Sequence, residues 1–222
     1  MSAVAPETLA DVLRRLGDVA PARVHWSPRP GEATADDLLR ISAGPPRRRV
    51  ELVDGTLVER TMGYHESLLA AVLLGYLLAH VRPRNLGIVA GPDGMVRLES
   101  DQVRLPDVSF TAWPSLTDDR SHLAPMLNVA PDLVVEILSP SNSAQEMARK
   151  RRDYFGGGTR LVWEVDPDSQ TVTVYSDSAN PDQGTEFGMA ATLTGGDVLP
   201  EFTLSVRDLF GDPQLQPRAA AQ

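Results

Sequence analysis

Two carboxylates and one lysine occupy positions at which their chemistry could be linked. Glu136 interrupts an apolar run, residues 131–139, whose branched aliphatic side chains predict a strand buried on both faces. Burying that carboxylate costs on the order of a few kcal/mol unless a cation or a hydrogen-bond donor meets it. Asp107 opens a second apolar strand, residues 106–111, and Lys150 lies on the helix predicted after Glu136. Two acids and a lysine on neighbouring elements suggest a divalent metal and phosphate chemistry.

The three residues match the needs of phosphodiester hydrolysis. Magnesium takes oxygen ligands in octahedral geometry, usually one or two protein carboxylates completed by water and substrate phosphate. The ion polarises a phosphoryl oxygen and supplies hydroxide near neutral pH, and a neighbouring ammonium group can stabilise the charged transition state. We therefore predict that Asp107 and Glu136 bind Mg²⁺, with Mn²⁺ as an alternative ion, and that Lys150 assists catalysis.

Each of these residues also has a purely structural interpretation. Glu136 could pair with a buried arginine, and Asp107 could simply be the residue at which a strand begins. Lys150 lies within the basic run 149–152, which could be a solvated helix surface. The helical spacing favours the functional interpretation, because Lys150 shares a face with a methionine and a tyrosine that are suited to burial.

Residue spacing and turn signals predict the elements that carry these side chains. Asp54–Gly55 lies between two short alternating runs and predicts a hairpin with a type I′ turn, in which both central positions need a positive φ. Thr34 begins a helix with acids in its first turn, and Ser143 begins another as a capping box with Glu146. The predicted helices cover residues 7–16, 34–41, 65–81, 143–155 and 206–210. The predicted strands cover the hairpin 50–59 and residues 87–90, 95–99, 107–112, 132–138, 160–165, 171–176, 186–192 and 202–204.

This order of elements indicates an α/β (α+β) fold with a mixed β-sheet flanked by helices. The chain has 222 residues, enough for one ordinary domain, and its 42% hydrophobic and 23% charged residues are typical of a globular protein. It has no cysteine, which excludes disulfides, zinc–thiolate sites and cysteine nucleophiles. We predict a flexible N-terminal segment over residues 1–32, an ordered domain over residues 33–210 and a flexible tail over residues 211–222.

Charge and hydropathy bear on partners and location. The formal net charge of −9 argues against a protein that holds nucleic acid tightly by bulk electrostatics, and the basic clusters 47–49 and 149–152 offset it only in part. The longest apolar stretch, residues 68–81, is too short to cross a bilayer, and the first residues lack the features of a signal peptide. We therefore expect a cytoplasmic protein without a membrane partner.

Several motifs, taken together in their order and spacing, resemble those of the Uma2 family, also called DUF820. The resemblance covers residues 33–210. The motifs that carry it are Glu51-Leu-Val-Asp-Gly55, His65 at the start of the apolar helix, Pro106-Asp107, the run 131–140, Lys150 with Tyr154, and Trp163-Glu-Val-Asp-Pro167.

The resemblance implies a restriction-endonuclease-like core of the PD-(D/E)xK nuclease superfamily, with an N-terminal β-hairpin extension. In that comparison Asp107 is the aspartate of the motif and Glu136 is its acidic metal ligand. The motif normally has lysine two positions after the second acid, where this chain has Leu138. The resemblance therefore assigns the role of the lysine to Lys150, on the following helix.

Two further residues match family positions. The resemblance implies that Glu51 approaches the metal or its water and that His65 assists a phosphate or the base. Each also has a structural alternative: Glu51 as an ordinary hairpin residue, and His65 as a capped histidine at the start of a helix.

Two functions from different classes follow. The first is an Mg²⁺-dependent endonuclease that hydrolyses phosphodiester bonds in DNA, as a homodimer by analogy with folds that pair to cut two strands. The second is a catalytically silent nuclease-fold module that contacts other proteins, which the acidic charge and the absence of an appended DNA-binding domain favour. An aromatic content of 5% disfavours a glycosidase, and the chain has neither a Gly-x-Ser-x-Gly elbow nor a phosphate-cradling Gly-Lys-Ser/Thr loop.

Overall fold

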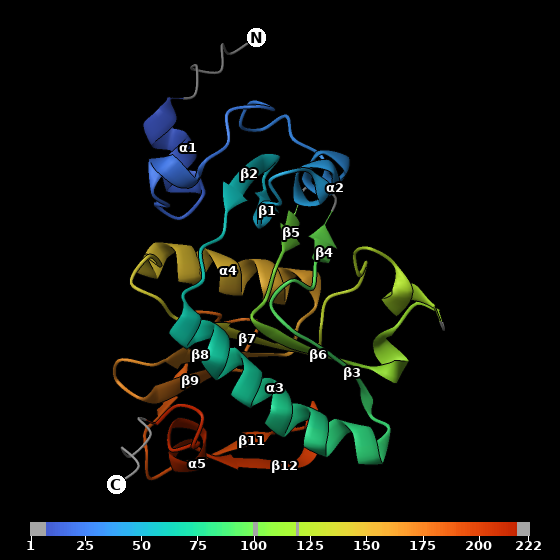
Figure 1. Ribbon diagram of the computed structural model, residues 1–222, viewed down its shortest axis with the longest axis vertical. Helices are drawn as coiled ribbons and strands as arrows, with labels where there is room; N and C mark the ends of the chain where they lie inside the picture. Colours follow the sequence, from blue (N-terminus) through green and yellow to red (C-terminus); the bar gives the residue numbers. More distant parts are fainter. Residues whose placement is uncertain (1–7, 100–101, 119, 217–222) are drawn as a thin grey trace, which may run out of the picture.

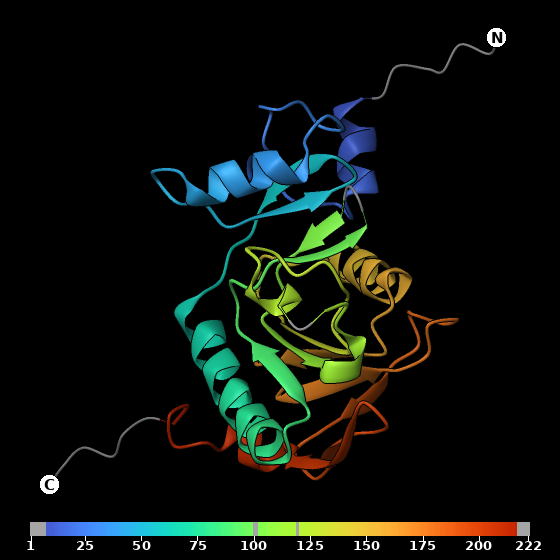
Figure 2. The ribbon, with the colours of Figure 1, turned by 90° about the vertical axis from the view of Figure 1, so that its right-hand side faces the viewer.

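A computed structural model describes residues 8–99, 102–118 and 120–216. Its centre is a six-stranded mixed sheet in the order β10-β9-β8-β7-β6-β3, accompanied by a four-stranded sheet, β2-β1-β5-β4, and a two-stranded sheet, β11-β12. In Figure 1 the four-stranded sheet lies at one end with α1 and α2, and α5 with β11 and β12 lies at the other. The view in Figure 2 shows the same three tiers from the side.

The observed elements lie close to the predicted ones, with three differences in the strands. The helices are α1 (Leu9–Arg15), α2 (Ala35–Ala43), α3 (Tyr64–Arg84), α4 (Ala144–Gly157) and α5 (Val206–Phe210), with 3₁₀ turns at Pro21–Arg23, Trp113–Ser115 and Ser121–Leu123. The strands are β1 (Val50–Val53), β2 (Thr56–Glu59), β3 (Gly87–Ala90), β4 (Val96–Glu99), β5 (Gln102–Arg104), β6 (Val108–Ala112), β7 (Leu133–Ile137), β8 (Leu161–Asp166), β9 (Thr171–Tyr175), β10 (Thr185–Phe187), β11 (Thr192–Gly195) and β12 (Leu199–Ser205). The prediction missed β5, merged β10 and β11 into one strand, and made β12 too short.

The connection from β7 to β8 contains α4 and places this helix over the face of the central sheet that carries Glu136. These two strands pair in parallel, whereas β6 pairs with β7 in the antiparallel sense. The predicted strand is buried on both faces: Leu133, Val135 and Ile137 join the core beneath α3, and Val134 packs with aromatic residues of α4. Glu136 lies on the α4 side of the strand, where Lys150 of that helix meets it.

The predicted hairpin is confirmed and forms part of the four-stranded sheet. Asp54 has a φ of 47° and Gly55 a φ of 65°, the positive values that a type I′ turn needs. β1 also pairs with β5, and the sheet packs its apolar face on α2. Glu51, on β1, is thereby held close to the central sheet.

Residues 8–32, part of the segment 1–32 that was predicted to be flexible, pack on the hairpin in the structure. Helix α1 and the turn after it bury Val12, Leu16 and two further valines against the hairpin, so this short segment completes a small core. Gly17 has a φ of 89° and approaches the start of α4 so closely that a Cβ atom there would lie 2.7 Å from the Cα of Glu146. The predicted tail lies partly outside the described residues; within them, the side-chain amide of Gln216 donates to the carbonyl of Phe210.

The start of α4 corrects one detail of the capping prediction. The Ser143 hydroxyl accepts from the backbone N–H of Glu146 at 2.9 Å, as predicted. The carboxylate of Glu146 does not return to the cap, because both guanidinium Nη atoms of Arg23 bind it, at 2.7 and 2.8 Å. A long-range ion pair has therefore replaced the second half of the capping box.

Helix α3 is longer than the predicted apolar stretch. With 21 residues, it is long and apolar enough to cross a membrane by length and composition alone, a test that the core helix of a globular protein also passes. Leu69, Leu73 and Leu77 on this helix are fully buried in the main core, against the face of the central sheet opposite α4.

Candidate active site

Asp107 and Glu136 meet at one end of the central sheet. Asp107 directly precedes β6 and lies one step beyond the Val108–Val135 pair that joins β6 to β7. Its Oδ2 accepts from the backbone N–H of Ile137 at 2.8 Å, which fixes the carboxylate beside Glu136. Asp107 is 1% exposed and Glu136 is 3% exposed, so both predicted metal ligands are withdrawn from bulk water.

Lys150 reaches this pair from α4. Its Nζ donates to Oε2 of Glu136 at 3.1 Å and lies 3.3 Å from Oε1 of Glu51, and its side chain is buried. The alternative of a solvated basic helix surface is therefore wrong for Lys150. Tyr154, one turn further along α4, donates its hydroxyl to the other oxygen of Glu136.

Glu51 joins the cluster from the hairpin, where its carboxylate lies beside Lys150 and Arg104. Its Oε2 accepts from Nη1 of Arg104 at 2.8 Å, and its Oε1 accepts from the backbone N–H of Leu105 at 3.2 Å. Arg104 also pairs with Asp153 of α4. Sequence reasoning missed Arg104 because it missed β5, on which this residue lies.

Arg60 is the most important residue that the sequence did not reveal. It follows β2, and its Nη2 bonds Oδ1 of Asp107 while lying 3.7 Å from Oε2 of Glu136. The side chain is 6% exposed. The structural alternative for Glu136, a buried arginine, is thus realised in part. No local pattern marks Arg60, because it is a single charged residue at the end of a short strand.

His65 is not brought to these carboxylates. It is exposed on the first turn of α3 and does not line the hollow around Asp107 and Glu136, whereas its neighbour Glu66 does. Across residues 8–99, 102–118 and 120–216, no three acidic or imidazole side chains converge closely enough to hold a metal ion by themselves. The side chains of Lys150 and Arg60 stand between the acids of the cluster.

The arginines beside Lys150 in the basic run form ion pairs with acids of the same chain. Arg149 pairs with Asp54 and Asp153, and Arg151 pairs with Glu164 and Asp182. The remaining arginine of the run, Arg152, also pairs with Asp182. This run therefore offers little free positive charge to a nucleic acid.

The pKa values of the cluster follow from burial and from its cations. Burial alone would raise the pKa of Glu51, but the positive charges of Lys150 and Arg104 outweigh it and lower that pKa. Burial raises the pKa of Glu136 above its usual range, and the cations Lys150 and Arg60 offset this only in part. Burial opposes the charge of Lys150, but Glu136 and Glu51 outweigh it and raise the pKa of the ammonium group. Lys150 is accordingly a permanent cation at neutral pH.

The lowered pKa of Glu51 predicts a pH-dependent contribution to stability. The folded state releases the Glu51 proton more readily than the unfolded chain does, so this contribution is present above the ordinary pKa of 4.5 and is lost as the pH falls below it. Replacing Glu51 by Gln should lower the free energy of unfolding at pH 7 by about 3 kcal/mol, the usual cost of breaking a buried ion pair. The difference from the unmodified protein should shrink below pH 4.5, as measured by urea unfolding from pH 3 to 7.

The exposed Glu32 provides the matched control for this titration. Glu32→Gln should leave the free energy of unfolding almost unchanged at every pH. A Glu51→Gln deficit that stays constant from pH 3 to 7 would show that the Glu51 charge does not stabilise the fold.

The donor atoms at Asp107 and Glu136 suit a hard divalent cation. Carboxylate oxygens are the ligands that Mg²⁺ prefers, and one or two of them per ion is the usual number. The two carboxylates already share a cation, since Nη2 of Arg60 bonds one of them and lies near the other. The residues present therefore fit the metal that the family resemblance implies, with Arg60 beside them in this structure.

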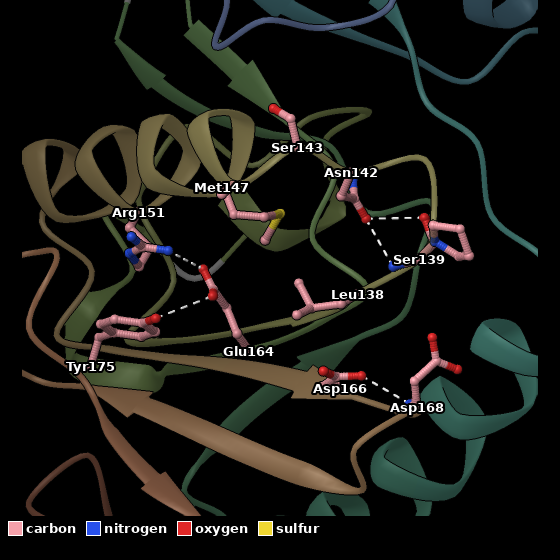
Figure 3. A pocket seen from close by; sticks show the side chains of 12 residues that line it. Leu138, Ser139, Asn142, Ser143, Met147, Arg151, Glu164, Asp166, Asp168 and Tyr175 are labelled. Carbon is pink, nitrogen blue, oxygen red and sulfur yellow. Dashed lines mark hydrogen bonds and ion pairs between the residues drawn. The ribbon is translucent and has the colours of Figure 1, made fainter.

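A wider pocket opens next to this buried cluster. It has a volume of about 500 Å³ and lies where β7 and β8 end against the first turns of α4. In Figure 3, Arg151 descends from α4 to Glu164 on β8, and Tyr175 meets the same carboxylate from β9. Ser139 and Asn142 line both this pocket and the hollow around Asp107 and Glu136, so the two spaces are neighbours.

Comparison with known proteins supports the same grouping. Residues 35–207 match the Uma2 family, whose description is "Putative restriction endonuclease". A solved structure of a "putative nuclease belonging to DUF820" from Anabaena variabilis has a TM-score of 0.69 and 25% sequence identity, over 82% of this chain and 99% of that chain. No curated protein matches this chain. The architecture is the predicted restriction-endonuclease-like fold, and the chain belongs to the Uma2 family of nuclease-like proteins.

Proposed function

We propose that this protein is an Mg²⁺-dependent endonuclease that hydrolyses phosphodiester bonds in DNA. The observation that carries the proposal concerns the buried carboxylates of Asp107, directly before β6, and Glu136, on the adjoining β7. They meet around one shared cation, the Arg60 guanidinium group, with the Lys150 ammonium group beside Glu136. Membership of a nuclease family supports the reaction class. Both the magnesium and the DNA substrate are parts of this proposal.

Each residue of the cluster has a distinct role in the proposed reaction. Asp107 and Glu136 would hold the ion, which polarises the phosphate and activates water when bound. The raised pKa of Lys150 keeps its ammonium group protonated, so this residue is a poor proton acceptor. Its role is to stabilise negative charge on the phosphate. Burial raises the pKa of Tyr154 well above its usual range, so its hydroxyl keeps its proton and orients Glu136. Glu51 is a positioning residue that holds Lys150 from the opposite side.

Substrate binding by this acidic chain should be weak and sensitive to salt. The net charge of −9 repels a polyanion, and the basic run on α4 is neutralised by acids of the same chain. DNA cleavage should therefore need low ionic strength and a high protein concentration.

The test is a nicking assay on supercoiled plasmid at low salt. The purified protein should relax the plasmid in Mg²⁺ or Mn²⁺ and should lose this activity in excess EDTA. Glu136→Gln, purified in the same way, should show no metal-dependent nicking, because it loses the charge that binds the ion. Equal nicking by the Glu136→Gln preparation would assign the activity to a contaminant and contradict the proposal.

One observation favours a second candidate, the catalytically silent module that contacts other proteins. Arg60 already neutralises Asp107, and the hollow beside the two acids is small. This candidate predicts no nicking and no calorimetric binding of Mn²⁺ by any variant of the chain. Metal binding that depends on Asp107 would exclude it.

A further inference from the structure

We propose that Arg60 is an internal counter-cation that competes with the divalent metal for Asp107 and Glu136. The inference rests on the proposed metal site and adds a residue that controls its occupancy. In the structure Arg60 holds the two acids together, and the ion and the guanidinium group exclude each other. Metal binding therefore requires the Arg60 side chain to withdraw.

The contacts of Arg60 show what holds its side chain in the site. Nη2 bonds Oδ1 of Asp107 and lies 3.7 Å from Oε2 of Glu136. Nη1 is buried and has no hydrogen-bond partner within the described part of the chain. A buried arginine that leaves a donor unsatisfied is held by charge and not by a complete set of hydrogen bonds. Such a side chain can be displaced by a stronger cation.

The space around Arg60 shows that the ion and the guanidinium group cannot be accommodated together. The hollow lined by Arg60, Asp107, Glu136 and Lys150 has a volume of about 10 Å³. A single water molecule needs roughly 10–15 Å³ of such space, and Mg²⁺ usually keeps several waters. With Arg60 in place there is no room for a hydrated ion or for a substrate phosphate.

Charge balance leads to the same conclusion. Lys150 already lies between Glu51 and Glu136, and Arg60 supplies the positive charge next to Asp107. A divalent ion bound in addition to both cations would place excess positive charge in a buried site. Exchange of Arg60 for the ion avoids that cost.

The withdrawal involves the side chain and not the strand that carries it. The backbone N–H of Arg60 donates to the carbonyl of Arg49 at 2.8 Å, which extends the pairing of β1 with β2. The next residue, Thr61, bonds its hydroxyl to that of Ser141 at 2.9 Å. The first contact fixes the backbone at Arg60 and the second ties the side chain of its neighbour, so rotation of the Arg60 side chain is the motion that breaks neither contact.

The test is calorimetric titration of EDTA-treated protein with Mn²⁺. Arg60→Met should bind Mn²⁺ at least about tenfold more tightly than the unmodified protein. In the unmodified protein the ion can bind only to the fraction of molecules whose Arg60 side chain has withdrawn, which lowers the apparent affinity. Arg40→Met removes an exposed arginine whose partner is Asp37 and should leave the affinity unchanged. The gain should vanish when Asp107→Asn is added to Arg60→Met.

The possible results separate this inference from the proposed function. Equal Mn²⁺ affinity in Arg60→Met and the unmodified protein, or weaker affinity in Arg60→Met, overturns the counter-cation role and leaves the metal site intact. Absence of binding in both proteins contradicts the metal site and the inference together. Arg60→Gln, which keeps a hydrogen-bond donor for Asp107 without the charge, should show the same gain and replaces Arg60→Met if that variant does not fold.

Discussion

Asp107→Asn lowers the metal-dependent nicking rate about a hundredfold or more while the protein stays folded. Loss of a residue that only supports a metal ligand typically costs 10–100-fold, so loss of the ligand charge itself should reach at least the upper end of that range. Asparagine has nearly the same shape and retains a side-chain oxygen that can accept from the backbone N–H of Ile137. The change therefore removes charge while sparing the local geometry.

Initial nicking rates at fixed Mg²⁺, with circular dichroism as the check on folding, measure this effect. Asp36→Asn, an exposed carboxylate in the first turn of α2, is the matched control and should retain the full rate. A folded Asp107→Asn protein that nicks within a few-fold of the unmodified rate would remove Asp107 from the reaction.

Lys150→Met lowers the free energy of unfolding by about 3–5 kcal/mol, the usual cost of removing one partner from a buried ion pair. The loss arises because Glu136 and Glu51 share this ammonium group and both carboxylates remain buried without it. Methionine fills a similar volume, so little of the loss should come from a cavity. The same change should also abolish nicking, since no other ammonium group in the described residues contacts Glu136.

Urea unfolding at pH 7 measures the loss of stability. Arg152→Met is the control from the same helix: its side chain is 52% exposed and pairs with an equally exposed Asp182, so it should change the free energy of unfolding by no more than about 1 kcal/mol. A Lys150→Met protein as stable as the control variant would show that the two glutamates do not depend on this lysine.

The sequence predicted the parts of the site that local patterns encode. Glu136 stood out because a charge inside an aliphatic run has no local explanation, and the structure places its carboxylate where Lys150 of α4 meets it. Helical spacing placed Lys150 on the buried side of α4 despite its basic neighbours. The hairpin turn followed from Asp54–Gly55, whose positive φ values the structure confirms.

Long-range ion pairs were beyond the reach of the same reasoning. Arg60 meets Asp107 across 47 positions of the sequence, and Arg23 meets Glu146 across 123. Neither arginine differs from a surface arginine in its local sequence. The Arg23–Glu146 pair also explains why only half of the predicted capping box forms. Ser143 caps the helix as predicted, but the Glu146 carboxylate binds Arg23 and not the backbone of the cap residue. Such contacts become visible only once the fold brings the elements together.

The N-terminal segment shows a related limit. Its helix α1 is short, and its composition, rich in proline and alanine, resembles that of a flexible leader. This segment is stabilised by packing against the hairpin, where its apolar side chains form a small core with Val53 and Val58. A segment of this kind owes its order to tertiary packing more than to its own helical propensity.

The most direct test of the metal site is anomalous diffraction from crystals soaked in Mn²⁺. We expect an anomalous peak within coordination range of the carboxylates of both Asp107 and Glu136, with the Lys150 ammonium group still bonded to Glu136 and the Arg60 side chain withdrawn. Manganese bound elsewhere, or no peak between these two acids in crystals of a protein that nicks DNA, would contradict this expectation.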